Sequence, residues 1–351
     1  MIDTDARAET DDAIARSLAR VRRRASGLGG DMEALGAAIE RAAGGGKRFR
    51  PALVVASFRA FGGADADALG VYDVAAAYEL LHTAFVAHDD VIDHDTVRRG
   101  IPNIGGEFRA RALDTGADAG GAALLGDAAG ILAGDLLLHE AQRIIALSPT
   151  PEPVRRALLD QFDDAVYVSA AGELADVGNA VAADVADSAS IFAAAYNKTA
   201  VYSFSAPLRA GALLADASPL AVDRIGAAGG RVGLAFQLVD DLIGAFGTAQ
   251  AAGRDEGVDL REAKRTPLIA YARESAEWAR VDAAVAVAHT GPVAVRQAQR
   301  LLERSGARSR LRTVIDDTLA DALRHAGDPV LPPAARNLLG DLAEQVTGRI
   351  P

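Results

Sequence analysis

A long apolar segment that ends in three aspartates constrains the fold of this chain more than any other feature. Residues 71–91 are mostly apolar, and Asp89, Asp90 and Asp93 stand at their end with spacings i, i+1 and i+4. At about 100° per residue, Asp89 and Asp93 share one face of a helix and Asp90 lies beside them. Carboxylates this close repel each other unless they share a cation. Oxygen ligands without a cysteine favour Mg²⁺ or Mn²⁺, so the pattern predicts a metal site on a helix.

A second pair of aspartates stands in another apolar helical segment much later in the chain. Asp240 and Asp241 are flanked by apolar residues on both sides, at 238–239 and 242–243. Gln237 lies one helical turn before Asp241, on the same side. A single acidic pair is typical of a solvated helix face, but two pairs with apolar neighbours indicate two halves of one metal site.

The basic residues add a second kind of ligand. Arg98 and Arg99 follow the first cluster closely, and guanidinium groups suit phosphate oxygens. Of the 37 Lys and Arg residues, only Lys47, Lys198 and Lys264 are lysines, and each stands beside a glycine-rich or acid-rich stretch. A compact ammonium differs from a guanidinium in size and hydration, so these positions favour sites that need the smaller cation. Acids, metal and basic residues together imply a diphosphate ligand.

Helical periodicity dominates the whole chain, and strand-like alternation is scarce. We therefore predict an all-α protein. The segment 100–118 contains several glycines and is expected to be partly loop, whereas the Gly/Ala-rich segment 116–134 favours a closely packed helix with small residues where it meets its neighbours. The expected helices cover 8–25, 31–43, 51–61, 68–95, 119–147, 152–178, 186–214, 219–246, 264–288, 292–305, 308–325 and 332–347.

Length and composition limit the class of protein. The chain has 351 residues and no Pro-, Gly- or Ser-rich linker, so we expect one domain over 1–351, with a motif-bearing core at about 40–270 and the helices of 271–351 in the same domain. The net charge of −11 argues against nucleic acid as a partner. The absence of cysteine excludes disulfides and thiolate metal sites and fits a cytoplasmic protein.

Membrane association is not expected from the sequence. The first twelve residues are acidic and lack the basic and apolar regions of a signal peptide. Asp127 and Asp135 interrupt the most apolar stretch, 119–138, so no uninterrupted apolar segment reaches the roughly 18 residues of a membrane span. We therefore expect a protein without a membrane span.

Seven ordered elements resemble those of one enzyme family. They are Gly45–Pro51, Leu80–His82, Asp89–Asp93, Arg98–Gly100, Lys198–Thr199, Phe236–Asp241 and Asp259–Lys264, and they cover roughly residues 40 to 270. In sequence and order they are similar to the trans-isoprenyl diphosphate synthases, or polyprenyl synthetases. The resemblance implies a single large helix bundle of the isoprenoid synthase type with a central substrate cavity. It also implies a Mg²⁺-dependent prenyltransferase that joins an allylic diphosphate to isopentenyl diphosphate.

The resemblance assigns roles to individual residues. Lys198 and Thr199 would lie near the allylic cation, and Lys198 would act in catalysis together with the aspartates. The expected ligands of Mg²⁺, with Mn²⁺ as a substitute, are Asp89, Asp90, Asp93, Asp240 and Asp241. Isopentenyl diphosphate would bind Lys47, Arg50, His82 and Arg99. The allylic diphosphate would bind Arg98, Lys198, Thr199, Gln237, Arg254 and Lys264.

Two positions depart from the family pattern. The second cluster of the family usually ends in a third aspartate, and this chain has Gly244 there. Arg254 stands where the family commonly has a lysine, which keeps the charge and changes the geometry. We expect the second cluster to bind metal with one outer-shell carboxylate fewer than in the family.

Three other classes of protein share part of these features. A noncatalytic partner subunit of a heteromeric synthase would tolerate the loss of metal ligands, but here the first cluster and the isopentenyl-binding residues are complete. A class I terpene cyclase shares the first acidic motif, but it generally carries an Asn/Ser/Glu triad as its second motif. A phosphohydrolase using His88 and Asp89 would need further histidine ligands that are not evident.

Product length and assembly also follow from the resemblance. The growing chain of such enzymes runs along the helix of the first aspartates, so Leu81, Ala84 and Phe85 are the expected floor. Phe85 lies four residues before Asp89, about 6 Å along the axis, while Ala84 is too small to close its own side. One aromatic residue predicts a short product: geranylgeranyl diphosphate (C20) is favoured over farnesyl diphosphate (C15). The resemblance alone implies a homodimer.

Overall fold

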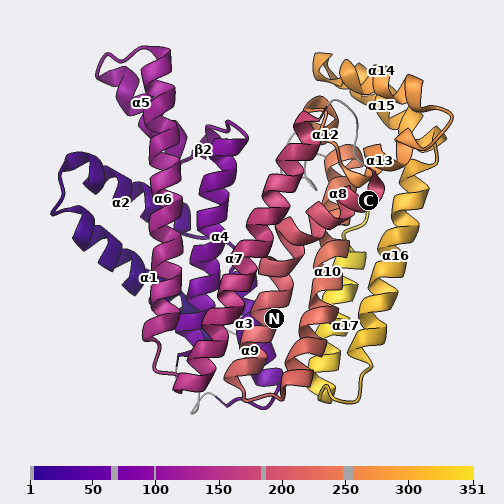
Figure 1. The fold of residues 1–351 in the computed structure, drawn as a ribbon. Coiled ribbons are helices and arrows are strands. Elements are labelled where there is room, and N and C mark those ends of the chain that lie inside the picture. Colours follow the sequence, from indigo (N-terminus) through magenta and orange to yellow (C-terminus); the bar gives the residue numbers. More distant parts are fainter. Residues whose placement is uncertain (1–3, 65–69, 99, 183–186, 248–255) are drawn as a thin grey trace. The chain divides into compact units, whose positions relative to one another are not determined.

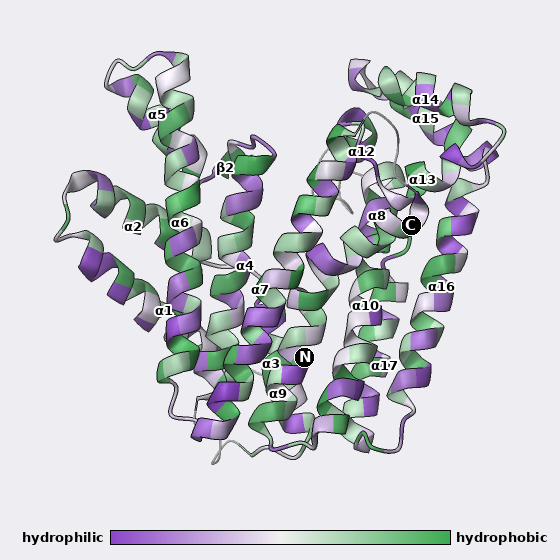
Figure 2. Ribbon diagram, in the orientation of Figure 1, coloured by the Kyte–Doolittle hydropathy of each residue, from purple (hydrophilic) through white to green (hydrophobic). Residues whose placement is uncertain are grey.

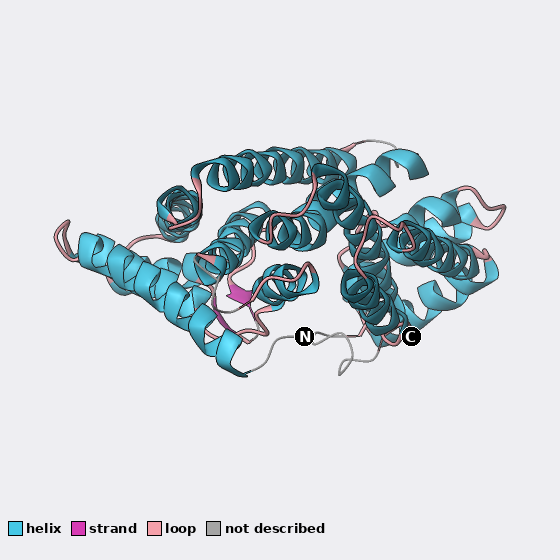
Figure 3. Ribbon diagram, turned by 90° about the horizontal axis from the view of Figure 1, so that it is seen from below, coloured by secondary structure: helices cyan, strands magenta, loops and turns pink. Residues whose placement is uncertain are grey.

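The computed structural model describes residues 4–64, 70–98, 100–182, 187–247 and 256–351. Within these residues the chain is helical apart from turns and one two-stranded antiparallel ladder, which confirms the all-α prediction (Figure 3). Contacts between Cα atoms divide the chain into two units, Met1–Phe162 with Ala210–Asp216, and Asp163–Arg209 with Ala217–Pro351. The single domain and its central cavity stay predictions.

The first unit is built around α4, Val71–Ile92. Its residues from Val74 to Leu81 are almost completely buried, with α1, α3 and α6 packed against them. A helix that is apolar on every side needs such cover. The elements of this unit are α1 Thr4–Ala25, α2 Gly30–Ala43, α3 Phe49–Ala60, β1 Val97–Arg98, β2 Ile101–Pro102, α5 Ile104–Asp114, α6 Ala119–Leu147 and the first part of α7 Glu152–Val181 (Figure 1).

The second unit is built around α10, Pro219–Phe246, which packs against a π-helix, α16 and α17. Along α16 the buried positions Leu311, Ile315 and Leu319 recur every four residues between hydrophilic ones (Figure 2). The other elements are the second part of α7, α8 Ser188–Ala195, the π-helix η2 Tyr196–Ser205, α12 Val258–Arg261, α13 Pro267–Arg273, α14 Trp278–Ala286, η3 Ala288–Thr290, α15 Pro292–Arg304, α16 Ala307–Ala326 and α17 Pro333–Thr347. The helix α9, Ala206–Leu214, begins in this unit and ends in the first.

Local capping explains where two of the long predicted helices begin. The side chain of Asp118 accepts a hydrogen bond from the Gly121 amide at the start of α6. Ser218 does the same for Ala221 at the start of α10, where Pro219 occupies the first turn. Both helices have the predicted bounds, because side-chain caps and a first-turn proline are readable from sequence.

Close packing of α6 relies on three glycines spaced four residues apart. A Cβ on Gly126 would lie 2.7 Å from the carbonyl oxygen of Gly105, and one on Gly130 would lie 2.4 Å from Val91. A Cβ on Gly134 would lie 2.1 Å from the His88 ring. This confirms the expected close-packed helix with small residues at its interfaces, on the side that faces α4 and α5.

The opposite side of α6 is exposed and apolar. Leu124, Leu125, Ile131 and Leu132 are exposed, with Leu124 at 72%. In the described part of the chain, α6 is the one helix long and apolar enough to cross a membrane by length and composition. Its glycine face is nonetheless packed within the unit, and Asp127 is paired with Arg109 at 2.8 Å.

Three predictions of secondary structure were wrong in part. The glycine-rich segment 100–118 is partly loop, as predicted, but it also holds the helix α5, which was not predicted and which begins where the Asn103 side chain accepts from the Gly106 amide at 2.8 Å. The predicted helix 264–288 is two helices, α13 and α14, separated by residues 274–277. Within the predicted helix 186–214, residues 196–205 form a π-helix instead of an α-helix.

Candidate functional site

The first aspartate cluster lies at the C-terminal end of α4. Asp89 and Asp90 occupy the last turn, and Asp93 is the first residue beyond the helix, with its amide donating to the Asp89 carbonyl at 2.8 Å. Asp90 is buried, at 7% exposure, whereas Asp93 is exposed. The chain then turns at His94, which adopts a φ of 58°, and leaves the helix. The three carboxylates are therefore close along the chain but differ in burial.

Arg98 returns to this cluster through the short β-ladder. Its Nε donates to Asp90 Oδ1 at 2.7 Å, and one of its terminal nitrogens lies 3.6 Å from Asp89 Oδ2. Burial raises the pKa of Asp90, and the Arg98 guanidinium offsets only part of that effect. The predicted diphosphate ligand Arg98 thus neutralises the predicted metal ligands here. Its neighbour Arg99 lies outside the described residues.

The basic residues of the glycine-rich loop differ in how deeply they are buried. Gly45 and Gly46 adopt positive φ of 69° and 87°, which glycine allows without strain. Lys47 is exposed and Arg50 half-buried, as phosphate ligands need to be. Arg48 between them is buried, and its backbone is in the left-handed conformation with a φ of 52°.

Arg48 fastens this loop to two helices. Its Nη1 donates to Glu79 Oε1 on α4 at 3.0 Å, and its Nε donates to Asp11 Oδ1 on α1 at 2.7 Å. Glu79 lies three residues before His82, so the contact ties the loop to the part of α4 that carries the predicted histidine. Sequence reasoning missed this role because it could not tell which of three nearby cations turns inward.

The residues of α4 before the aspartates differ in their surroundings. His82 and Phe85 are half-buried, whereas Leu81 and Ala84 are fully buried in the core of the first unit. Of the three residues predicted to end the product cavity, Phe85 alone has a side chain with solvent access.

The second cluster lies near the C-terminal end of α10. The Asp241 carboxylate is 8% exposed and accepts a hydrogen bond from Gln237 Nε2 at 2.9 Å. Burial raises the pKa of Asp241 to about 8, and the charge of Asp259 adds to the shift. Asp240 is more exposed and pairs with Arg349, which also lies 4.3 Å from the centre of the Phe236 ring. A carboxyl placed as Asp241 is would be held in its charged form by a nearby cation.

Lys198 and Thr199 lie in the π-helix η2, a geometry that is frequent at functional sites. Lys198 Nζ lies 3.0 Å from Glu173 Oε2 and 3.0 Å from Asp176 Oδ2, both on α7. The π-helix approaches α7 at Gly172, where a Cβ would lie 2.2 Å from the Lys198 amide nitrogen. Glu173 and Asp176 were not predicted, since nothing in their local sequence separates them from solvated acids.

The last predicted lysine lies beyond α12. Lys264 is exposed, with its Nζ 3.1 Å from Glu262 Oε2 and its amide donating to the Asp259 carbonyl at 2.9 Å. Arg254 lies outside the described residues. Among the residues that the structure does describe, no three acids or histidines are gathered closely enough to hold a metal ion without movement. Asp90 and Asp240 are instead paired with arginines.

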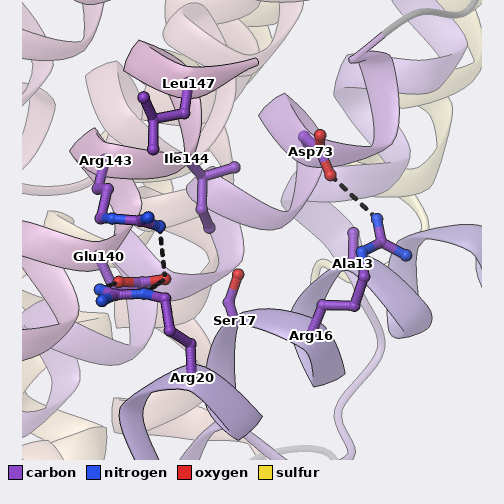
Figure 4. A pocket seen from close by; sticks show the side chains of 9 residues that line it. All are labelled: Ala13, Arg16, Ser17, Arg20, Asp73, Glu140, Arg143, Ile144 and Leu147. Atoms are coloured by element: carbon purple, nitrogen blue, oxygen red, sulfur yellow. Dashed lines mark hydrogen bonds and ion pairs between the residues drawn. The ribbon is translucent and has the colours of Figure 1, made fainter. Parts of the chain in front are cut away.

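Among the described residues, the first unit holds two pockets to compare with the predicted site. One of about 330 Å³ is lined by Gly44, Gly45 and Arg48, and so adjoins the loop that carries Lys47. The other, of about 180 Å³, contains none of the predicted site residues (Figure 4). There the buried Glu140 pairs with Arg20 and Arg143, and Arg16 pairs with Asp73. The charged side chains that line this pocket form ion pairs with one another, and these pairs link α1 to α4 and α6.

Comparisons with known proteins agree on one family. The family model described as polyprenyl synthetase matches residues 32–303. A short chain isoprenyl diphosphate synthase of Methanothermobacter thermautotrophicus is 32% identical over 264 residues, 75% of this chain and 74% of that protein. A nonaprenyl diphosphate synthase of Mycobacterium tuberculosis is 32% identical over 287 residues, 80% of this chain and 76% of that protein.

A solved structure matches along nearly the whole chain. The geranylgeranyl pyrophosphate synthase of Corynebacterium glutamicum, complexed with isoprenyl diphosphate and magnesium, superposes with a TM-score of 0.89. It is 27% identical and covers 99% of this chain and 100% of its own.

Proposed function

The chain belongs to the polyprenyl synthetase family, and we propose that it is a short-chain trans-prenyl diphosphate synthase that makes geranylgeranyl diphosphate. It would join isopentenyl diphosphate to an allylic diphosphate and release diphosphate. The observation that carries the proposal is that the central helix of each unit ends in adjacent aspartates, one buried and one more exposed. These are Asp90 beside Asp89, and Asp241 beside Asp240.

The donor set fits a divalent cation. Asp89, Asp93 and Asp240 offer carboxylate oxygens that are accessible in part, and buried Asp90 and Asp241 stand next to them. Hard oxygen ligands of this kind suit Mg²⁺, with Mn²⁺ as a substitute. When bound, the metal would stabilise the charge that grows on the departing diphosphate.

The protein's own residues would position the two substrates. Lys47 and Arg50, carried on the loop that Arg48 fastens, would bind isopentenyl diphosphate together with His82 and Arg99. Arg98, Gln237, Arg254 and Lys264 would hold the allylic diphosphate. Lys198 and Thr199, in the π-helix, would lie near the allylic carbon. Glu173 and Asp176 would orient the ammonium of Lys198.

Phe85 supports a short product. Leu81 and Ala84 are buried in the core, so Phe85 is the member of this group whose ring is available to end a cavity. We therefore favour C20 over C15. Relatives named for longer products keep the length open to experiment, as the nonaprenyl synthase illustrates.

One assay tests the activity. The purified protein alone, with Mg²⁺, isopentenyl diphosphate and farnesyl diphosphate, is expected to yield C20 alcohol after dephosphorylation and chromatography. No product under these conditions, together with activity after a second chain is added, would favour the noncatalytic partner subunit.

The exposed side of α6 supports a homodimer, which we place in the cytoplasm. Leu124, Leu125, Ile131 and Leu132 form an apolar stripe on the side opposite the glycines, and such a stripe is typical of a covered surface. Light scattering of the wild type should give twice the chain mass, and Ile131→Lys should give monomers. A wild type that is monomeric, or that binds vesicles, contradicts this part of the proposal.

A further inference from the structure

The helix α1 contacts the glycine-rich loop through two polar side chains. Arg7 donates from Nη2 to the Gly46 carbonyl at 3.0 Å, and Asp11 Oδ1 accepts from Arg48 Nε at 2.7 Å. Arg7 and Asp11 lie one turn apart on α1, and their charged groups are 3.8 Å from each other. The two contacts hold the loop on either side of Lys47, which is one of the expected ligands of isopentenyl diphosphate.

Arg48 has a backbone conformation that its neighbours must support. A non-glycine residue with a φ of 52° is strained, and such strain persists only where the surrounding contacts fix it. The Arg48 guanidinium donates to the Ala43 carbonyl at the end of α2 at 3.0 Å and to Glu79 on α4, in addition to Asp11. The acceptors belong to three different helices, so α1, α2 and α4 together fix the course of the loop.

Side-chain packing gives the loop little support on the side of α1. The pocket of about 330 Å³ lies between apolar residues of α1 and the glycines Gly44 and Gly45. Arg7, Asp11 and Arg48 line the same pocket. Because this space separates the apolar part of α1 from the loop, the polar contacts of these three residues decide where the loop lies relative to α1.

These contacts of α1 lie outside the part of the chain that identifies the family. The helix α1 ends at Ala25, and the polyprenyl synthetase model matches residues 32–303. The sequence elements that resemble the family also begin only at Gly45. A contribution of α1 to substrate binding therefore follows from the contacts in this chain, and the family match does not assign it.

We propose that Arg7 and Asp11 are positioning residues for isopentenyl diphosphate, because they hold the glycine-rich loop where Lys47 and Arg50 bind the diphosphate. The proposal rests on the proposed function, since it takes this loop as the binding site of that substrate. A loop that loses one of the contacts also populates positions in which the two cations point elsewhere. The apparent affinity then falls with the fraction of molecules whose loop remains in the binding conformation.

The test uses Asp11→Asn, which keeps the shape of the side chain and removes the charge that pairs with Arg48. Isopentenyl diphosphate is titrated into the protein without an allylic substrate, and calorimetry gives the dissociation constant without turnover. This constant should rise about tenfold, the effect of one charge-assisted hydrogen bond. In steady-state kinetics the KM for isopentenyl diphosphate should rise in parallel, while kcat and the allylic KM stay near the wild-type values.

Two further variants make the test independent of folding. Arg7 is exposed, so Arg7→Gln should fold as the wild type does and should also raise the dissociation constant for isopentenyl diphosphate. Asp12→Asn is the matched control, because it removes a negative charge from the neighbouring exposed position of α1 and should leave the constant unchanged. If Asp11→Asn lowers thermal stability and leaves the constant unchanged, α1 only stabilises the fold and the proposal is overturned.

Lys47→Ala separates this proposal from the proposed function. If Lys47→Ala weakens isopentenyl diphosphate binding and neither Asp11→Asn nor Arg7→Gln does, the loop binds its substrate without α1 and the proposal is overturned. If all three variants weaken binding while the wild type makes no condensation product, the positioning role stands and the proposed function fails. An equal rise in both KM values in Asp11→Asn also overturns the proposal, because a positioned loop acts on one substrate.

Discussion

Arg349 pairs with Asp240 across 109 residues of sequence, with its guanidinium stacked 4.3 Å from the centre of the Phe236 ring. The pair repeats in the second unit what Arg98 and Asp90 do in the first. In each unit, an arginine forms an ion pair with a carboxylate that the proposed function assigns to the metal. Metal binding must therefore displace or share an arginine.

Replacing Arg349 should tighten metal binding by the free protein. In Arg349→Gln the Asp240 carboxylate no longer has this competing cation, so the dissociation constant for Mn²⁺, followed by electron paramagnetic resonance without diphosphate, should fall several-fold. Arg312→Gln is the matched control, because Arg312 pairs with Asp316 on an exposed face of α16. Unchanged Mn²⁺ affinity in Arg349→Gln would show that the pair opens at no cost.

Removing one metal-binding carboxylate should abolish most of the activity. Asp89→Ala or Asp240→Ala is expected to lower kcat by about 10²–10³ or more, because preorganised charge stabilisation of the leaving group is lost. Circular dichroism should show the wild-type helix content, since both side chains are partly exposed. Near-normal turnover at saturating Mg²⁺ contradicts the metal assignment.

Lys47 and Lys264 should each affect the KM of a different substrate. Lys47→Ala should raise the KM for isopentenyl diphosphate far more than that for the allylic substrate, because Lys47 lies exposed on the glycine-rich loop of the first unit. Lys264→Ala is the reciprocal variant and should act mainly on the allylic KM. Steady-state kinetics with each substrate varied in turn measures both. Equal effects of Lys47→Ala on the two KM values would rule out separate pockets.

The stability of the metal-free protein should fall as pH rises. Burial raises the pKa of Asp241 to about 8, from an ordinary value of 3.8. Between about pH 4 and pH 8 the folded state therefore holds a proton that the unfolded chain has lost, and its free energy of unfolding decreases with pH. Denaturant titrations in EDTA should show this decrease in the wild type and not in Asp241→Asn, with a plateau above about pH 8.

Magnesium should reverse that trend, because it competes with the proton for Asp241. The stabilisation that Mg²⁺ gives in the presence of diphosphate is expected to be greater at pH 8 than at pH 6. The same pH profile in wild type and Asp241→Asn would mean that this carboxyl is ionised throughout.

Shortening Phe85 should lengthen the product. Phe85→Ala removes the one aromatic ring of the predicted floor, and chromatography after dephosphorylation should show chains beyond C20. Leu81→Val serves as control, since Leu81 is buried in the core and its change should lower stability without moving the product distribution. Wild-type chains of C30 or longer, or an unchanged distribution in Phe85→Ala, would place the floor elsewhere.

Sequence reasoning was most accurate where local chemistry decides the structure. The starts of α6 and α10 follow from Asp118, Ser218 and Pro219, whose capping roles require only neighbouring residues. The helix α5 escaped prediction because Gly105 and Gly106 are typical helix breakers. In the folded chain they permit close approach, since a Cβ on Gly106 would lie 2.1 Å from the Thr96 carbonyl.

Long-range contacts explain most of what the sequence could not predict. Arg48 and Arg50 are chemically identical, and the position of Glu79 on α4 decides that Arg48 turns inward. The glycine at 244 is visible in the sequence, but the close approach of Asp259 to it depends on how α12 packs against α10 and α15.

The π-helix around Lys198 makes the chain sensitive to a change in length at that point. A π-helix bonds each amide to the carbonyl five residues earlier, so it fits more residues into a turn than the α-helix, which bonds to the fourth. Deleting one residue between Tyr196 and Ser205 would let α8 and α9 join as a continuous α-helix with their outer packing intact. Side chains within residues 196–205 would then change direction by about 100°, since each would move by one position along the helix. Evolution by single-residue insertion or loss, more than by substitution, could thus redirect Lys198 and Thr199 while the helices around them stay in place.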